Sequence, residues 1–288
     1  MSPQQPTPSQ KPILGIAFLG YAIACLTLTF WLISHQQQIS SKHNLKTMAG
    51  SLLPISPIIS HRTAPDFAAI GNVQEKKQRF FEFLLPAIHQ QNATLSQQRQ
   101  WLIAQKHNNA PTTEQLATVQ QLAKRYRVPD AERLSYQALI DELLVHVDII
   151  PAALVLAQAA NESAWGTSRF ATEANNYFGQ WCFSSGCGVV PKQRNTGATH
   201  EVARFKSADA SVEAYFLNLN RNQSYRKLRR IRAEMRKNNQ KIDAIQLAEG
   251  LEHYSSRGEA YIEELQAMIR YNKLQQYPDI LESKKAAT

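Results

Sequence analysis

The sequence predicts a mainly helical α+β fold, in which several helices surround one buried helix and a small β lobe lies beside them. Apolar residues recur at helical spacing in segments spread over residues 74–145. A nearly all-apolar run at residues 151–160 is typical of a helix buried in a core. Residues 181–205 are rich in Gly, Ser, Thr and Asn and contain short β-branched runs, which indicates short strands joined by turns. A chain of 288 residues has room for one sizeable catalytic domain plus extensions.

The N-terminal segment divides into three parts. Residues 1–12 are rich in Pro, Gln and Ser and are predicted to be disordered. Residues 13–34 are predicted to be a transmembrane anchor, because residues 13–33 carry no charge and can cross a bilayer core of ~30 Å. A signal peptide cleaved near Cys25 is the alternative, but the apolar run continues beyond that residue. The flanking charges do not decide the orientation of the anchor, and residues 35–73 are interpreted as a linker.

Residues 74–147 are predicted to be a helical extension without catalytic residues. Its first helix is expected over residues 74–92, and Pro86 should end or kink it. Further helices are expected over residues 97–108, 113–126 and 136–145. We interpret the extension as a platform that packs against a catalytic domain at residues 148–277.

The predicted buried helix carries the candidate catalytic residue, Glu162. Pro151 suits the first turn of this helix and Gly166 suits its end. Glu162 lies near the C-terminal end and shares an apolar stripe with Val155 and Ala159, which follow the same helical spacing of four and then three residues. Desolvation and the helix dipole should therefore both raise the pKa of its carboxyl group, as a proton donor to a glycosidic bond requires. The alternative is a structural glutamate that faces water or pairs with Arg169.

The residues around Glu162 resemble a known motif. The stretch A-Q-A-A-N-E-S-A-W-G-T-S-R-F-A, followed by N-N-Y-F-G, is similar to the pattern A-Q-x-x-x-E-(S/T)-x-W-G-x-S, then N-(L/Y)-F-G, of the glucosaminidase family of peptidoglycan hydrolases. The match over residues 157–179 is specific, and the preceding helices more weakly resemble the Bax-type branch of this family. The resemblance implies a lysozyme-like fold, cleavage of the glycan strand after N-acetylglucosamine, and Glu162 as the catalytic acid.

Two further catalytic residues are expected, each with a structural alternative. Glu201 lies in the predicted β lobe, where the family carries a second acidic residue that can hold a water or stabilise positive charge on the sugar. The local pattern T-H-E-V-A-R-F does not fix that correspondence, and the alternative is a solvent-facing strand residue. Tyr254 matches the active-site tyrosine of the family, although the residues after it depart from the family pattern. Its alternative is a half-buried tyrosine at a helix junction.

Aromatic residues close to Glu162 in the chain suggest how a sugar is held. Sugar rings pack their C–H faces on aromatic rings, whereas hydroxyl and acetamido groups need polar partners. The predicted substrate-binding residues are Asn176, Tyr177, Phe178, Gly179 and Trp181. We expect at least one of these three aromatic residues to line the cleft, and we expect Trp165 to lie mainly in the core. The alternative is that all four aromatic residues are core residues.

Two cysteines follow the motif in the stretch C-F-S-S-G-C. In an oxidising compartment Cys182 and Cys187 are expected to form a disulfide, whereas in a cytosolic protein they would be ordinary thiols. The chain has three cysteines in total, so a zinc site of sulfur ligands is not expected. No cofactor is predicted.

The C-terminal region is predicted to consist of helices. Ser207 should cap a helix whose inward side contains Val212, Tyr215, Phe216 and Leu219. The basic segment at residues 225–237 is interpreted as a solvated helix face, and the alternative is a surface that attracts wall carboxylates. Two more helices and a loose tail are expected over residues 242–249, 259–271 and 278–288.

The charge of the protein is consistent with an acidic partner. The net charge is +9 and the pI is ≈ 9.5, and peptidoglycan carries free carboxylates. No zinc-finger spacing, phosphate loop or RNA-binding signature occurs in the sequence, so nucleic acid is not expected as a partner. The expected partners are peptidoglycan glycan strands and the inner membrane, with the catalytic domain facing the periplasm or cell exterior.

Two alternative functions remain open from the sequence. A lytic transglycosylase or muramidase would normally carry a Gly-Leu-Met-Gln-like turn, where this chain has the residues N-Y-F-G. A non-catalytic wall-binding protein is disfavoured because Glu162 stands in an intact motif.

Overall fold

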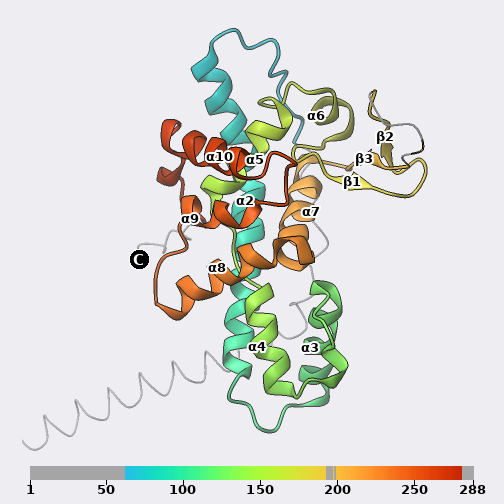
Figure 1. Cartoon of the computed structure of the whole chain (residues 1–288), viewed down its shortest axis with the longest axis vertical. Coiled ribbons are helices and arrows are strands. Elements are labelled where there is room, and N and C mark those ends of the chain that lie inside the picture. Colours follow the sequence, from blue (N-terminus) through green and yellow to red (C-terminus); the bar gives the residue numbers. More distant parts are fainter. Residues whose placement is uncertain (1–61, 193–196, 198, 281–288) are drawn as a thin grey trace, which may run out of the picture. The chain divides into compact units, whose positions relative to one another are not determined.

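The computed structural model describes residues 62–192, 197 and 199–280. The predicted disordered segment, the predicted anchor at residues 13–34, most of the linker and most of the C-terminal tail lie outside the described residues. The described part is mainly helical and contains one three-stranded sheet (Figure 1), which confirms the mainly helical prediction. Within this part, no helix combines the length and the apolar character needed to cross a membrane.

Helix α2, Val73–Gln105, runs through 33 residues without a break. The side chain of Asn72 caps it by accepting hydrogen bonds from the amides of residues 74 and 75, at 2.9 and 3.0 Å. Pro86 does not end the helix, which was one of its two predicted effects, and residues 97–105 belong to α2 rather than to a separate helix. A proline removes one helical hydrogen bond, and burial on both sides of Pro86 holds the helix together. The buried apolar residues there are Phe80, Phe81, Phe83, Leu84, Ala87 and Ile88.

Two helices pack together beside the C-terminal half of α2 (Figure 1). Helix α3, Thr113–Tyr126, begins with a capping box between Thr112 and Gln115. A short 3-10 helix, η1 (Ala131–Arg133), leads to helix α4, Tyr136–His146, which Ser135 caps. The starts of α3 and α4 agree with the sequence prediction, because both carry a side-chain cap that is visible in the sequence.

Helix α5, Ala152–Ser163, lies at the centre of the C-terminal half. Every residue from Ala152 to Ala160 is buried, as expected for a helix that is apolar on all sides. Helix α2 packs against α5, as do α9 (Ala244–Ala248), α10 (Glu259–Tyr271) and the 3-10 helix η4 (Leu274–Gln276).

The start of the predicted loose tail holds the N-terminal end of α5. The carboxylate of Asp279 accepts a hydrogen bond from the amide of Ala152 at 2.8 Å, where the helix dipole favours a negative charge. The side chain of Asn92 in α2 donates to the carbonyl of Asp279 at 3.0 Å, and His89 contacts the carbonyl of Pro278 at 2.8 Å. These first tail residues therefore connect α5 to α2.

The small β lobe follows helix α6, Arg169–Ala174. Its strands are β1 (Trp181–Cys182), β2 (Gly188–Val189) and β3 (Glu201–Ala203), in the antiparallel order β1-β3-β2. Short strands were predicted within residues 181–205, and all three strands lie in this region. Gly188 is required in β2, because a Cβ atom there would lie 2.0 Å from the carbonyl oxygen of Val202.

Helix α7, Ala208–Arg221, begins at Ser207 as predicted and packs against α2. Its four predicted inward residues are all buried. The chain continues through the 3-10 helix η2 (Gln223–Tyr225), helix α8 (Arg226–Lys237) and the 3-10 helix η3 (Glu249–Leu251).

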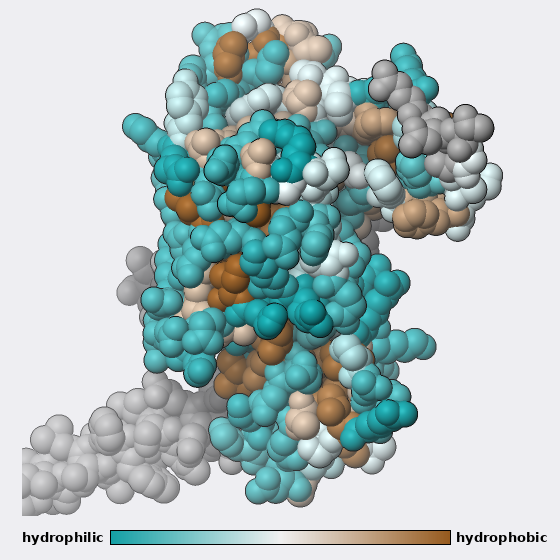
Figure 2. Space-filling view, viewed as in Figure 1, coloured by the Kyte–Doolittle hydropathy of each residue, from teal (hydrophilic) through white to brown (hydrophobic). Residues whose placement is uncertain are grey.

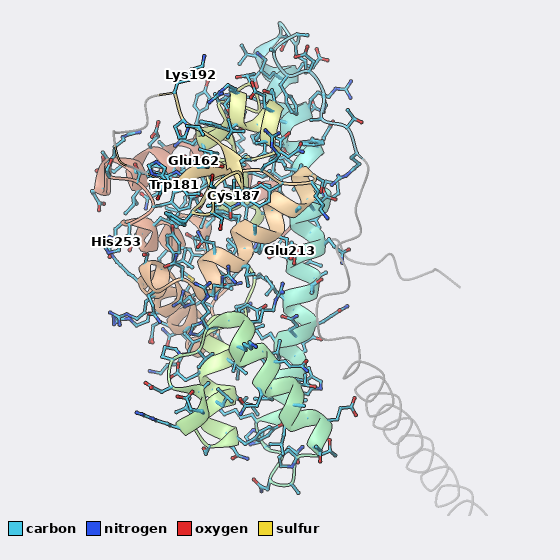
Figure 3. All side chains as sticks on the ribbon, turned by 90° about the vertical axis from the view of Figure 1, so that its right-hand side faces the viewer. Glu162, Trp181, Cys187, Lys192, Glu213 and His253 are labelled. Atoms are coloured by element: carbon cyan, nitrogen blue, oxygen red, sulfur yellow. A yellow bond between two sulfur atoms is a disulfide. The ribbon has the colours of Figure 1, made fainter. Side chains whose placement is uncertain are left out.

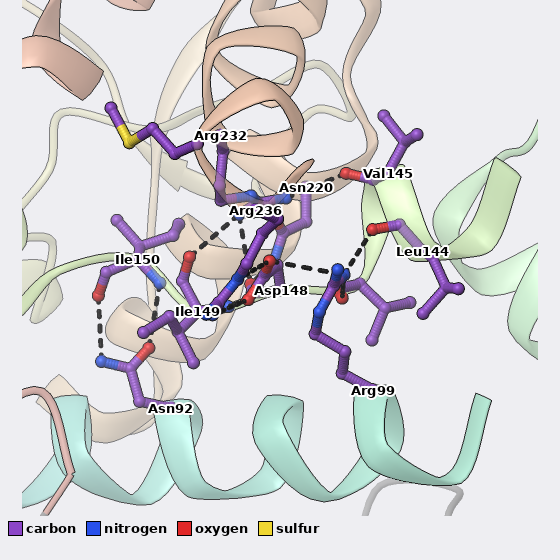
Figure 4. A network of polar contacts seen from close by, with 12 residues as sticks. Asn92, Arg99, Leu144, Val145, Asp148, Ile149, Ile150, Asn220, Arg232 and Arg236 are labelled. Atoms are coloured by element: carbon purple, nitrogen blue, oxygen red, sulfur yellow. Dashed lines mark hydrogen bonds and ion pairs between the residues drawn. The ribbon is translucent and has the colours of Figure 1, made fainter. Parts of the chain in front are cut away.

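The expectation that α8 presents a solvated basic face is wrong for two of its arginines. Arg229 and Arg232 are 2% and 1% exposed. Arg232 donates hydrogen bonds to the carbonyls of residues 145, 146, 148 and 149 and to the side chain of Asn220 (Figure 4). The guanidinium group has five donors, and the C-terminal end of α4 leaves carbonyls without helical partners. Two of the positive charges on α8 are therefore buried, where they donate hydrogen bonds to backbone carbonyls.

A buried carboxylate completes this network (Figure 4). Arg236 binds Asp148 through two hydrogen bonds of 2.9 and 2.8 Å, and Arg99 of α2 lies 3.3 Å from the same carboxylate. These hydrogen bonds from arginine, together with the positive charges, hold the pKa of Asp148 below its ordinary value, although burial acts in the opposite direction. The network joins α2 and α8 to the segment that leads into α5.

Candidate active site

Glu162 occupies the last turn of α5, where the helix ends abruptly. Ala164, Trp165 and Gly166 all have positive φ, and the hydroxyl of Ser163 accepts a hydrogen bond from the amide of Gly166 at 2.8 Å. A side chain on Gly166 would meet the ring of Phe67, with a Cβ atom 2.4 Å from it. Close packing at this helix end therefore fixes the backbone immediately after Glu162.

The carboxyl group of Glu162 opens into a groove with a volume of ≈ 970 Å³. The walls come from the turn before β1, from one side of α7, and from the segment after η3. Figure 3 shows Glu162 close to the labelled Trp181 of β1. The groove-lining residues outside α7 and η2 include Phe178, Gly179, Gln180, Trp181, Phe183, Glu252, His253 and Tyr254. The groove is large enough to hold a ligand of several rings.

A chain of buried polar side chains holds one oxygen of Glu162. The hydroxyl of Tyr261 donates to Oε1 of Glu162 at 2.8 Å, and Nε2 of Gln158 donates to the Tyr261 hydroxyl at 3.0 Å. The hydroxyl of Tyr215 donates in turn to Oε1 of Gln158. Burial and the charge of Glu162 hold the pKa of Tyr261 far above its ordinary value, so its hydroxyl remains a donor. This chain fixes the orientation of the carboxyl group.

The electrostatics of Glu162 favour its protonated form. Burial raises the pKa of Glu162, while the hydrogen bonds from Tyr261 and Asn161 act in the opposite direction. The nearby charge of Glu264 raises the pKa further, and that of Arg257 lowers it. The net effect is a pKa above the ordinary value, in the direction predicted from the sequence. The geometry and the pKa together suit a proton donor.

Asn176, predicted to bind substrate, is instead a structural residue of the turn that precedes β1. It is 1% exposed. Its amide group donates to the carbonyls of Gln180 and Ala203, at 2.9 Å each, and its oxygen accepts from the amides of Phe178 and Gln180. Gly179 has a positive φ of 63°, and a Cβ atom there would lie 3.5 Å from Oε2 of Glu162. Asn176 therefore shapes the turn, and Gly179 leaves space beside Oε2 of Glu162.

The three aromatic residues predicted for the cleft have different positions. Tyr177 is 1% exposed and packs against Phe80 and Phe83 of α2, so its predicted place in the cleft is wrong. Phe178 lines the groove, but its ring is buried and stacks on Tyr215 with ring centroids 4.1 Å apart. Trp181 is 59% exposed and remains available to a ligand.

Trp181 belongs to an exposed apolar surface on the β lobe. Its ring stacks on His200 with centroids 4.2 Å apart, and Phe183 close by is 72% exposed. Figure 2 shows hydrophobic side chains on the surface of this lobe, whereas most of the viewed face is hydrophilic. Exposed aromatic rings at the mouth of a groove are suited to the C–H faces of sugars. Trp165, by contrast, packs on Phe80 and Phe81, in agreement with its predicted core position.

Tyr254 lies in the groove wall, and Tyr261 holds the acid. The Tyr254 hydroxyl donates to the carbonyl of Phe178 at 2.7 Å, and its ring is parallel to that of Tyr261, with centroids 5.7 Å apart. Tyr254 thus supports the turn that faces Glu162. Its catalytic role stays a prediction. Tyr261 was not predicted as a site residue. The signal for it is Gln158, a polar residue one turn before Glu162 in an apolar helix, which requires a buried hydrogen-bond partner.

Glu201 has a structural position in the β lobe. It is 6% exposed, which contradicts the solvent-facing alternative. Its two carboxylate oxygens accept hydrogen bonds from the amides of Gly186 and Gly188, at 2.9 and 2.8 Å. Glu201 is absent from the described lining of the groove. The geometry therefore favours a role in holding the loop rather than the predicted role at the reacting sugar.

A disulfide closes the same loop. The structure joins Cys182 to Cys187, with their Cα atoms 6.2 Å apart. Both cysteines and Glu201 place possible ligand atoms within 4.8 Å of one another. Because the two sulfurs are bonded to each other, they are not thiolates that could bind a metal. The cluster instead fixes the β1–β2 loop next to Trp181.

Comparison with known proteins supplies independent information. Residues 137–274 match the family described as mannosyl-glycoprotein endo-beta-N-acetylglucosaminidase. The chain is 32% identical over 212 residues to protein bax of Escherichia coli (strain K12), and the alignment covers 73% of this chain and 74% of that protein. No solved structure matches the chain.

Proposed function

Because the chain belongs to the glucosaminidase family, we propose that it hydrolyses peptidoglycan glycan strands after N-acetylglucosamine, with Glu162 as general acid. Membership in the family indicates a hydrolase that acts on glycans. The observation that carries the finer proposal is the carboxyl group of Glu162, which opens into the groove with a raised pKa and a fixed orientation.

The proposed reaction begins with proton transfer from Glu162 to the glycosidic oxygen. Tyr261 holds Oε1, and Oε2 lies beside the space that Gly179 leaves open. As the bond to the leaving sugar breaks, positive charge develops on the sugar that stays in the groove. A water molecule then attacks the anomeric carbon of that sugar and returns a proton to the carboxylate of Glu162. Trp181 offers that strand an exposed ring on which to stack.

Glu252 supplies a second carboxylate in the groove wall. Lys227 donates a hydrogen bond of 2.7 Å to it and lowers its pKa below the ordinary value. The environments of Glu162 and Glu252 therefore shift their pKa values in opposite directions, as in an acid paired with an ionised carboxylate. In this proposal Glu252 takes the charge-stabilising role that the sequence prediction gave to Glu201.

Digestion of purified peptidoglycan tests the proposal. We expect mass spectrometry of the products to show reducing N-acetylglucosamine ends. The variant Glu162→Gln, which keeps the shape of the side chain, should lose activity at least a hundredfold. Glu263→Gln, an exposed change on α10, is the matched control and should keep it. Anhydro-muramic ends would indicate a lytic transglycosylase, and reducing muramic ends a muramidase. Binding without cleavage by the wild type would indicate a wall-binding protein.

The same proposal includes a location. A disulfide between Cys182 and Cys187 supports an oxidising compartment, and residues 13–34 have the composition of a membrane anchor. In this proposal the anchor crosses the inner membrane once and the catalytic domain faces outward. Protease treatment of spheroplasts should digest the domain without lysis, and its full protection would contradict this orientation.

A further inference from the structure

Arg221 lines the described part of the active-site groove, together with one histidine, His253. Among the lining residues there is no other arginine and no lysine. Helix α7 contributes residues 214, 217, 218 and 221 to the groove wall, at the helical spacing that places side chains along one stripe. Arg221 stands at the end of that stripe and is half-buried.

Arg221 has no acidic partner among the described residues. Burial, and then the charges of Arg127 and Arg125 at the end of α3, lower the pKa of Arg221, but an arginine stays charged at neutral pH. The three arginines together make this region positive. Arg125 is paired with Glu213 at 3.1 Å. The carboxylate of Glu252 in the same groove is already paired with Lys227 at 2.7 Å. This end of the groove therefore presents an uncompensated positive charge to a ligand.

The position of Arg221 relative to Glu162 shows which part of a ligand it meets. Tyr215 on α7 is connected to Glu162 through Gln158 and Tyr261. Arg221 lies six residues further along the same helix, which corresponds to about 9 Å along its axis. Glu162 and Arg221 both line this groove, so a glycan strand seated at Glu162 can extend to Arg221.

We propose, on the basis of the function proposed above, that Arg221 binds a carboxylate of the glycan strand and selects an acidic, peptide-bearing strand over neutral N-acetylglucosamine oligomers. The lactyl-linked peptide on alternate sugars of peptidoglycan carries such carboxylates next to the N-acetylglucosamine. Arginine suits this task because its planar guanidinium group binds a carboxylate through two parallel hydrogen bonds. The structural alternative is that Arg221 only stabilises the C-terminal end of α7, as a cation in the last helical turn can.

The experiment compares Arg221→Gln with Arg230→Gln in the full-length protein. Arg230 is exposed on α8, lies outside the groove lining, and provides the same change of charge. The probes are peptidoglycan strands with free carboxylates, the same strands after amidation, and a neutral N-acetylglucosamine oligomer. Cleavage is measured as kcat/KM. Binding is measured by co-sedimentation or calorimetry in a Glu162→Gln background, so that it does not depend on catalysis.

We expect Arg221→Gln to lower the ratio of acidic to neutral kcat/KM about tenfold, mainly through KM, since a hydrogen-bonded ion pair is lost. The salt dependence of binding to acidic strands should weaken as well, and Arg230→Gln should change neither quantity. An equal effect of Arg221→Gln on acidic and amidated strands, or no effect on either, would overturn the proposal. If the wild type cleaves nothing but binds acidic strands through Arg221, the proposed hydrolase function fails while the carboxylate site stands.

Discussion

Replacing Arg232 by methionine should destabilise the protein by about 3–5 kcal/mol. The side chain is 1% exposed and donates five hydrogen bonds. Three of its acceptors are fully buried: the carbonyls of His146 and Asp148, and the side-chain oxygen of Asn220. The carbonyl of Asp148 keeps a second donor, Nδ2 of Asn220 at 3.1 Å. A buried acceptor left without a donor costs about 1 kcal/mol or more, so the other two acceptors account for about 2 kcal/mol. The remaining bonds and the reduced charge beside Asp148 add to this loss.

Urea unfolding of Arg232→Met and Arg230→Met, followed by circular dichroism, measures the difference. The two arginines lie on the same helix, but Arg230 is exposed, so its variant should stay within about 0.5 kcal/mol of the wild type. Arg232→Lys keeps a charge with fewer donors and should fall between the two. If Arg232→Met loses less than about 1 kcal/mol, or no more than the Arg230 control, the reasoning from buried acceptors is refuted.

Three further predictions concern the groove and the β lobe. Tyr261→Phe removes a hydrogen-bond donor that lowers the pKa of Glu162. The pKa of Glu162 should therefore rise further, and the alkaline limb of the pH–activity profile should move to higher pH. An unchanged alkaline limb would contradict the assigned hydrogen bond. Trp181→Ala should weaken glycan binding with little change in melting temperature, whereas Tyr177→Ala should cost about 3–5 kcal/mol of stability; the reverse pattern would contradict their assigned positions. Replacing both cysteines of the β lobe by serine should cost about 2 kcal/mol, as expected for a short loop, and calorimetry showing no loss would mean that the disulfide does not stabilise the lobe.

Local signals in the sequence were sufficient for most helices and for the surroundings of Glu162. The starts of α3, α4 and α7 coincide with side-chain caps that the sequence displays. The burial of α5 follows from its composition, and the raised pKa of Glu162 follows from its place near the end of that helix. These features depend on neighbours within about one helical turn, so periodicity and capping rules describe them well.

Features that depend on distant parts of the chain were not predictable. Helix α2 passes through Pro86 because residues on both sides of it are buried by other elements. In the sequence, Arg232 belongs to a run of basic residues of a kind that is usually exposed. Its burial depends on carbonyls at the end of α4, which are more than 80 positions away in the chain. Tyr261 reaches Glu162 from 99 positions away in the chain. Glu201 of β3 accepts hydrogen bonds from amides 15 and 13 positions away in the chain.

The position of α2 sets a limit on how far the protein can be shortened. The residues that match the family begin at 137, and α2 ends at Gln105. Nevertheless Phe80 and Phe83 of α2 cover Tyr177, and Arg62 pairs with Asp209 of α7 at 2.6 Å. A fragment cut to the matched residues would expose this apolar surface to water. We expect such a fragment to aggregate, and a fragment that begins just before Arg62 to fold. The smallest autonomous folding unit is therefore larger than the segment by which the family is identified.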